Sequence, residues 1–240
     1  MMLKAFLLLT TSLLLPVLPA HSLEFPMTGD RGAPARTQSG GRRDDLCQLS
    51  AEKSVRAIVP HNNVSTFSGQ QASLWLHVPT EISQKEAEIF VQNPETFEVV
   101  YQKSLFLSDI AETGLIRVDL PPLNDKGKRL LSEDQDYFWE FAVICDASDR
   151  SRDHVAQGFI QRVENTIAAN RLGTSGADTS AGLRQQAEAY AEAGLWQETL
   201  AIAAQLRATE PTVWSQLLSS VGLSAFINEP FLDCCWPSET

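Results

Sequence analysis

LSEDQDYFWEFAVICDASDR, residues 131–150, holds the most apolar run of the chain outside its N-terminus. Tyr137, Trp139, Phe141 and Val143 would share one face of a strand, because side chains alternate with a period of two. The opposite face carries mostly apolar residues as well. A strand that is apolar on both faces is expected at the centre of a sheet. This run therefore predicts the central strand of a β-sandwich, closed by a cysteine and a charged loop.

Similar short apolar runs, separated by turn residues, extend on both sides of this stretch. We predict seven strands, at 54–59, 72–78, 86–92, 98–106, 115–120, 137–145 and 155–163. No helical period intervenes, which favours a seven-stranded antiparallel β-sandwich of the immunoglobulin or fibronectin-III type. Leu131 lies six residues before Tyr137, a spacing typical of the tyrosine corner of such folds. The alternative is an ordinary strand that follows a leucine by chance.

A helical period replaces the alternation after residue 163. We predict a short helix at 164–172, a hairpin of two helices at 183–208 with Gly194 at its turn, and a last helix at 213–226 that begins near Pro211. The segment AYAEAGLWQETLAIAAQLRATEP, residues 189–211, resembles one tetratricopeptide unit. Such repeats need about three copies to be stable alone. We therefore expect the hairpin to pack on the sandwich or on the last helix, and a peptide-binding repeat array is the alternative.

The N-terminus has the features of a secretory signal peptide, at residues 1–22. A basic start is followed by the uncharged stretch 5–18 and by small residues around His21, which predicts cleavage near Ser22. The alternative, an uncleaved membrane anchor, would need ~20 apolar residues. We expect an exported protein of the periplasm or extracellular space, with no membrane span after cleavage. A flexible linker is predicted at 23–46, the sandwich domain at 47–163 and a helical region at 164–240.

The formal net charge is −11, and the basic residues are scattered along the chain. An acidic surface repels phosphate backbones, so nucleic acid is not an expected partner. We expect another envelope protein as the partner.

Four cysteines occur, at positions 47, 145, 234 and 235. Export permits disulfides, and four cysteines allow three full pairings. In a fibronectin-like sandwich, Cys47 before the first strand and Cys145 at the end of the sixth would lie at the same end, so we predict a Cys47–Cys145 disulfide. It would close a long loop, and loop-closure entropy assigns such a bond about 4–5 kcal/mol. Cys234 and Cys235 are adjacent, and can be reduced, bridge two molecules or form a vicinal disulfide.

The sequence contains no recognisable catalytic, cofactor or metal motif. The densest charged cluster follows the sixth strand and comprises Asp146, Asp149, Arg150, Arg152 and His154, with Asp153 between the last two. It is either a solvated hairpin loop with weak ion pairs or a recognition loop on a rigid sandwich. Calcium binding by its aspartates is opposed by the interleaved arginines.

Several short motifs resemble the domain-of-unknown-function family 928, which is found mainly in cyanobacteria. They are GAPART (32–37), RAIVP (56–60), ICDASDRS (144–151), GFIQRV (158–163) and WSQLLSSVGL (214–223). The resemblance covers nearly the whole mature chain and implies a bacterial, exported protein. It supplies no catalytic or binding residues. The run RRDD at 42–45 departs from the more glycine-rich segment expected there.

These observations favour a non-enzymatic protein-interaction module of the cell envelope. One alternative is a hydrolase of envelope polymers that uses Asp146, Asp149 or Glu140, which would require a pocket joining two carboxylates. Another is a carbohydrate-binding module with Trp75 exposed beside His77. No cofactor and no metal are expected for any of the three.

Overall fold

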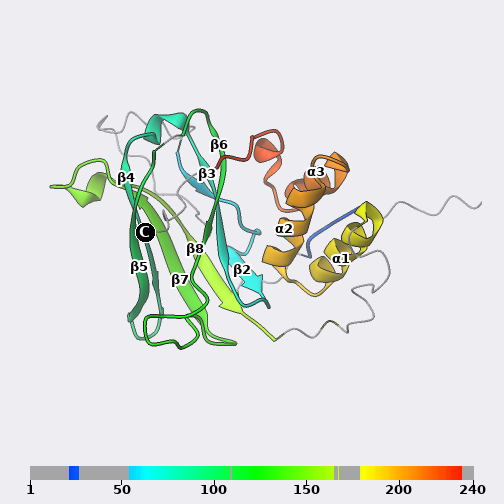
Figure 1. The fold of residues 1–240 in the computed structure, drawn as a ribbon, viewed down its shortest axis with the longest axis horizontal. Helices are drawn as coiled ribbons and strands as arrows, with labels where there is room; N and C mark the ends of the chain where they lie inside the picture. The colour runs from blue at the N-terminus through cyan, green and yellow to red at the C-terminus, as the bar shows by residue number, and fades with distance from the viewer. Residues whose placement is uncertain (1–21, 27–53, 109, 165–166, 168–178, 234–240) are drawn as a thin grey trace, which may run out of the picture.

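The computed structural model describes residues 22–26, 54–108, 110–164, 167 and 179–233. Two β-sheets pack face to face, and three helices lie beside them (Figure 1). The chain is therefore mainly β with a helical C-terminal part, as the sequence predicts. Residues 1–21 of the predicted signal peptide, most of the predicted linker and the helix predicted at 164–172, except Glu164 and Ile167, lie outside the described residues.

The sheets contain three and five strands. The three-stranded sheet has the order β1-β3-β6, with β1 at Arg56–Ala57, β3 at Ser73–Val78 and β6 at Gly114–Asp119. The five-stranded sheet has the order β2-β8-β7-β4-β5, with β2 at Val64–Phe67, β8 at His154–Arg162, β7 at Asp136–Val143, β4 at Glu86–Gln92 and β5 at Val99–Phe106. The central position predicted for the strand at 137–145 is confirmed, because β7 pairs with both β4 and β8.

The described residues form eight strands where the sequence predicts seven, and one pair of neighbouring strands is parallel. The strand predicted at 54–59 is reduced to β1, and the chain then crosses to the other sheet, where β2 runs parallel to β8. Pro60 cannot donate to a ladder, and Asn63 adopts a φ of 56° while its N–H donates to the Pro60 carbonyl at 2.9 Å. This turn ends β1 and redirects the chain into β2, whose four residues VSTF form no apolar run.

Large side chains of β7 lie in the interior of the sandwich. Trp139 and Phe141 are fully buried there. Tyr137 is buried too, and its hydroxyl accepts a hydrogen bond from the Ser132 N–H at 3.2 Å, the upstream bond that the spacing from Leu131 predicts. On the outward side of β7, Phe138 and Glu140 are half-buried and Ala142 is buried, so the strand is only partly covered on that side.

The three helices pack against the outer side of the three-stranded sheet and against β2 (Figure 1). They are α1 at Ser180–Glu192, α2 at Trp196–Leu206 and α3 at Pro211–Ser220. Gly194 joins α1 to α2 with a φ of +72°, and α3 begins at Pro211, as predicted. A second apolar cluster fills the contact and includes Ile58, Trp75 and Leu115 from the sheet side. The hairpin therefore packs on the sandwich as well as on α3.

The N-terminal residues 22–26 belong to this helical cluster. Leu23 and Phe25 fall within the predicted flexible linker, yet they are 1% and 4% exposed. Their N–H groups donate to Gln216 Oε1 at 3.1 Å and to Ser220 Oγ at 3.0 Å, and the Phe25 ring packs edge-on against Trp196. The sequence predicts a flexible linker here because two isolated apolar side chains in a polar segment give no periodic signal.

The C-terminal residues cover the edge of β6. The Leu115 N–H donates to the Pro230 carbonyl, and the Leu232 N–H donates to the Leu115 carbonyl, both at 2.8 Å. A side chain at Gly114 would approach the Pro230 oxygen to 2.6 Å, so glycine permits this contact. Arg207 secures the segment, because its guanidinium donates to the carbonyls of Ile227 and Glu229.

No helix in the described part of the chain is long and apolar enough to cross a membrane.

Candidate functional site

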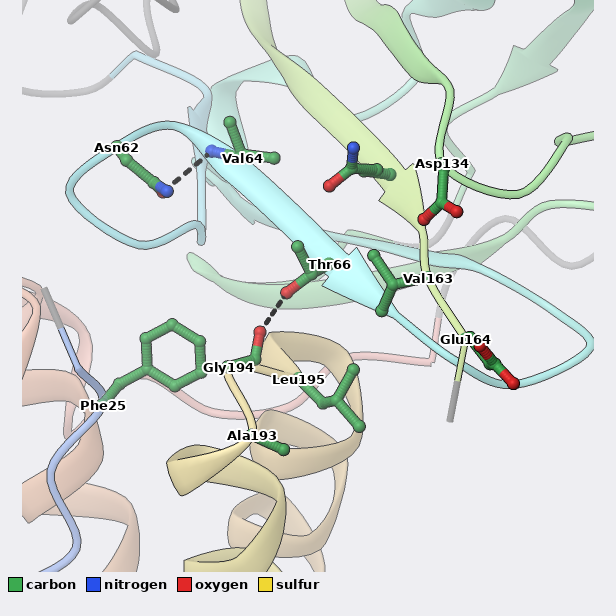
Figure 2. Close-up of a pocket in the computed structure, with 11 residues that line it drawn as sticks. Phe25, Asn62, Val64, Thr66, Asp134, Val163, Glu164, Ala193, Gly194 and Leu195 are labelled. Carbon is green, nitrogen blue, oxygen red and sulfur yellow. Dashed lines mark hydrogen bonds between the residues drawn. The ribbon is translucent and has the colours of Figure 1, made fainter. Parts of the chain in front are cut away.

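A groove of about 370 Å³ lies where the five-stranded sheet meets the helical hairpin (Figure 2). Strands β2 and β8 form one wall, and the turn between α1 and α2 forms another. Its lining includes Phe25, Val64, Thr66, Asp134, Val163, Glu164 and Leu195. These residues come from five separate segments of the chain, so the groove exists only because the helices dock beside β2.

Hydrogen bonds fix the docking of the helices at the base of the groove. The Thr66 hydroxyl donates to the Gly194 carbonyl (Figure 2). It also accepts from the Trp196 N–H at 3.3 Å. Deeper in the contact, the Trp196 indole N–H donates to the Ile58 carbonyl at 3.2 Å. Because Trp196 is 1% exposed and each of these groups has a hydrogen-bond partner, this wall of the groove is fixed in place by the fold.

The first turn of α2 adds side-chain bonds to the strands. Glu198 Oε1 accepts from the Ser68 N–H at 2.7 Å, the Ser68 hydroxyl at 2.9 Å and the Gly69 N–H at 3.0 Å. Gln197 is buried and bridges β2 and β3, because it donates to Ser65 Oγ and accepts from the Ser73 N–H. The loop after β2 is thus held to the helix by polar contacts rather than by apolar packing alone.

Two carboxylates stand at the rim of the groove. Asp134 precedes β7, has a φ of 57° and donates its N–H to the Arg162 carbonyl at 2.8 Å. Glu164 follows β8, and in Figure 2 both carboxylates lie across the groove from the Phe25 ring. Both side chains belong to exposed residues, and neither is in an ion pair with a lysine or arginine of the described segments. The lining below this rim is mixed, with Val64, Val163 and Leu195 beside Asn62, Thr66 and Gln161. A negative rim next to apolar side chains suits a cationic group on an aliphatic stem.

The sequence did not single out Asp134 or Glu164. Asp134 lies between Leu131 and Tyr137 of the predicted corner, and Glu164 is the first residue of the helix predicted at 164–172. A turn residue and a residue after a strand carry no signal of their own. Only the pairing of β2 with β8 and the docking of Gly194 bring them to one groove.

Hydrogen bonds and an ion pair between residues of the predicted recognition loop hold its conformation. Asp149 caps a 3₁₀ turn at Arg150–Arg152 and pairs with Arg152 at 3.0 Å, while Asp146 accepts from the Ser148 N–H and hydroxyl. Hydrogen bonds from the serine hydroxyls lower the pKa of Asp146 and of Asp149. Its role in recognition stays a prediction, as does that of His154, whose pKa burial lowers.

The Arg150 side chain extends from this loop to the outer face of the five-stranded sheet. It pairs with Asp153 and, at 3.1 Å, with Glu88 on β4. Glu140 of β7 faces the same side, and burial, followed by the negative charge of Asp153, raises its pKa. These groups form a charged cluster on a sheet face, and none of them lines the groove.

The carbohydrate-binding hypothesis required an exposed Trp75, and that expectation is wrong. Trp75 is 9% exposed and meets the Phe231 ring edge-on at 5.8 Å. His77, on the same strand, packs against Phe226 and lies 4.0 Å from a Glu229 oxygen, and burial lowers its pKa. The C-terminal residues and α3 occupy the surface that a sugar would need.

Among the residues that the structure describes, no three histidine, cysteine, aspartate or glutamate side chains gather as a metal site. The same residues contain no free cysteine. Cys47, Cys234 and Cys235 lie outside them, so the Cys47–Cys145 pairing stays a prediction.

Comparison with known families gives one match. The family described as Domain of Unknown Function (DUF928) matches residues 38–231. The chain belongs to this family. The match spans both the sandwich and the three helices, so every residue that lines the groove except Phe25 lies within the matched region. No curated protein and no solved structure matches the chain.

Proposed function

We propose that this protein is a non-enzymatic binding module of the cell envelope, exported by its signal peptide, that holds a segment of another protein in the groove. The observation that carries the proposal is the groove itself, where Asp134 and Glu164 form no ion pair with a described cation and stand at the rim of a lining that includes apolar side chains. Exposed carboxylates at the rim of a groove are suited to attracting a cationic group. The partner segment would carry a lysine or arginine next to an apolar residue.

Binding of two capped peptides tests the chemistry of the groove. We expect acetyl-Lys-Leu-Lys-amide to shift the NMR signals of Thr66, Gly194 and Leu195, and acetyl-Glu-Leu-Glu-amide to leave them unchanged. In the double variant Asp134→Asn, Glu164→Gln, loss of two exposed ion pairs should weaken binding roughly 2- to 30-fold. Equal shifts with both peptides, or an unchanged affinity in the variant, would contradict the proposal.

Photo-crosslinking in the native envelope tests the partner. A benzoyl-phenylalanine at Ala193, an exposed groove residue, should give a crosslinked species that the Asp134→Asn, Glu164→Gln variant loses. The same group at the exposed Lys126, outside the groove, is the matched control. A crosslinked product that forms equally from both positions, or that the Asp134→Asn, Glu164→Gln variant still gives, would show that the crosslinking is not specific to the groove.

The hydrolase alternative retains one supporting observation, because the groove does join two carboxylates. They are Asp134 and Glu164, not the predicted Asp146, Asp149 and Glu140. Hydrolysis of purified peptidoglycan or envelope polysaccharide by the wild type, abolished by either Asp134→Asn or Glu164→Gln, would favour it over a binding module. Release of no product by the wild type would exclude it for those polymers.

A further inference from the structure

Strand β5 borders the five-stranded sheet on the side away from the helices (Figure 1). It has eight residues and pairs only with β4 among the described strands. The Leu107 N–H donates to the Lys85 carbonyl, and Leu105 lies opposite Ala87. Because hydrogen-bonded pairs alternate along an antiparallel ladder, the N–H and C=O groups of Gln102, Ser104 and Phe106 point away from β4. No described segment pairs with them.

Apolar side chains are exposed along the same edge. Of the five large apolar side chains exposed in the described residues, three lie in β5 or in the turn before it. They are Phe97 at 73%, Val99 at 49% and Phe106 at 54% exposure. An unpaired strand edge with exposed apolar residues is the surface on which strand addition occurs.

Phe97 is held in an unfavourable backbone conformation. Its φ is 59°, in the left-handed region that bulky residues avoid. The Asn93 side chain accepts from the N–H groups of Glu95 and Thr96, and the Phe97 N–H donates to the Asn93 carbonyl, which closes the turn. Because the Phe97 ring is exposed, its contacts within the chain offset little of this backbone strain. A contact between the ring and another molecule better explains why phenylalanine stands at this position.

The charges around the edge indicate what kind of molecule fits. Glu86, Glu95 and Glu98 are exposed there, none is in an ion pair with a described cation, and the chain as a whole carries −11. A second copy would bring the same carboxylates together. If two β5 strands paired antiparallel with Lys103 at the centre, the two lysines would lie opposite each other and repel. An extended segment with basic residues at its two ends would meet complementary charge at the two ends of β5.

We propose that β5 accepts an extended, basic and apolar segment of another protein as a sixth strand of the sheet. This surface is distinct from the groove and does not depend on the function proposed for it. The outward backbone groups of Gln102, Ser104 and Phe106 would bond the added strand. Phe97, Val99 and Phe106 would pack on its apolar side chains, and the flanking carboxylates would meet its basic residues.

Amide hydrogen exchange with a defined peptide tests this. Acetyl-Lys-Val-Thr-Val-Thr-Phe-Lys-amide should slow exchange at Gln102, Ser104 and Phe106, and weaken with added salt, while the same peptide with glutamate at both ends should not bind. Ser104→Pro removes one outward N–H at an edge position that tolerates proline, and should reduce the affinity about tenfold with the fold retained. Phe97→Gly should reduce the affinity while raising the melting temperature, because glycine relieves the positive φ.

Three results would overturn the proposal. One is protection of residues elsewhere but not of the three outward amides. The second is unchanged affinity in both Ser104→Pro and Phe97→Gly. The third is a concentration-dependent dimer that Ser104→Pro abolishes, which would assign the edge to a second copy. The Asp134→Asn, Glu164→Gln variant should bind this peptide normally, which separates the edge from the groove.

Discussion

The five-stranded sheet ends in two edges that the molecule treats differently. At β2 the edge is short and is met by the helical hairpin, through Thr66, Gln197 and Glu198. At β5 the edge is twice as long, and no described element covers it. The β6 edge of the other sheet resembles β2, because the C-terminal residues bond to it. Of these three edges, only β5 lacks a covering segment among the described residues, and we therefore propose that a partner strand binds there.

The largest effect should come from removing the anchor of the covered edge. Trp196→Ala deletes a buried indole that packs on Phe25 and donates to the Ile58 carbonyl. We expect a loss of about 3–5 kcal/mol in the free energy of unfolding, measured by urea denaturation. Trp196→Phe, which keeps a ring but loses the indole N–H, should lose less. Equal stability of Trp196→Ala and the wild type would show that the helices contribute little to the sandwich.

A smaller loss of stability is expected when the polar contacts at the β2 edge are removed. Glu198→Ala removes the acceptor of three hydrogen bonds from Ser68 and Gly69, and should cost about 1–3 kcal/mol. A double-mutant cycle with Ser68→Ala should show a coupling of about 0.5–1.5 kcal/mol. Strictly additive losses would mean that Glu198 and Ser68 do not interact in solution.

The sheet face beside the open edge should show a pH dependence. The raised pKa of Glu140 means that the native state holds this proton more tightly than the unfolded state, whose value is near 4.5. The native state then binds more protons above pH 4.5, so its stability should fall as pH rises from there through the raised pKa. Glu140→Gln should flatten this part of the pH profile of unfolding. Glu95→Gln, on the exposed turn, is the control, and an identical profile for the two variants would contradict the assignment.

The smallest effect on stability is expected at the open edge itself. Phe106→Ser exchanges a ring that is 54% exposed and should change the free energy of unfolding by less than about 0.5 kcal/mol. It should nevertheless weaken binding of the basic strand peptide. A loss of stability comparable to that of Trp196→Ala would show that β5 is covered in solution and would remove the contrast between the edges.

The strands of this protein were largely predictable, because periodicity is a local property. Residues 86–92 form the predicted strand without change, and the other predicted strands except the first shift by one or two residues at their ends. The turn at Gly194 and the helix start at Pro211 were predictable because each residue has a specific backbone preference. The strand β2 was missed because its four residues contain Ser65 and Thr66 and form no apolar run.

The groove and the open edge could not be predicted in the same way. The sequence alone determined the class of fold, the central strand at Tyr137 and the helical hairpin, because these depend on neighbours within a few residues. Only the tertiary structure decided that β2 runs parallel to β8, that Thr66 meets Gly194, and that β5 is left without a partner in the described chain. The β2–β8 pairs join residues 95 positions apart, and the Thr66–Gly194 bond joins residues 128 positions apart. Which edge is covered depends on the packing of the whole chain rather than on any local pattern.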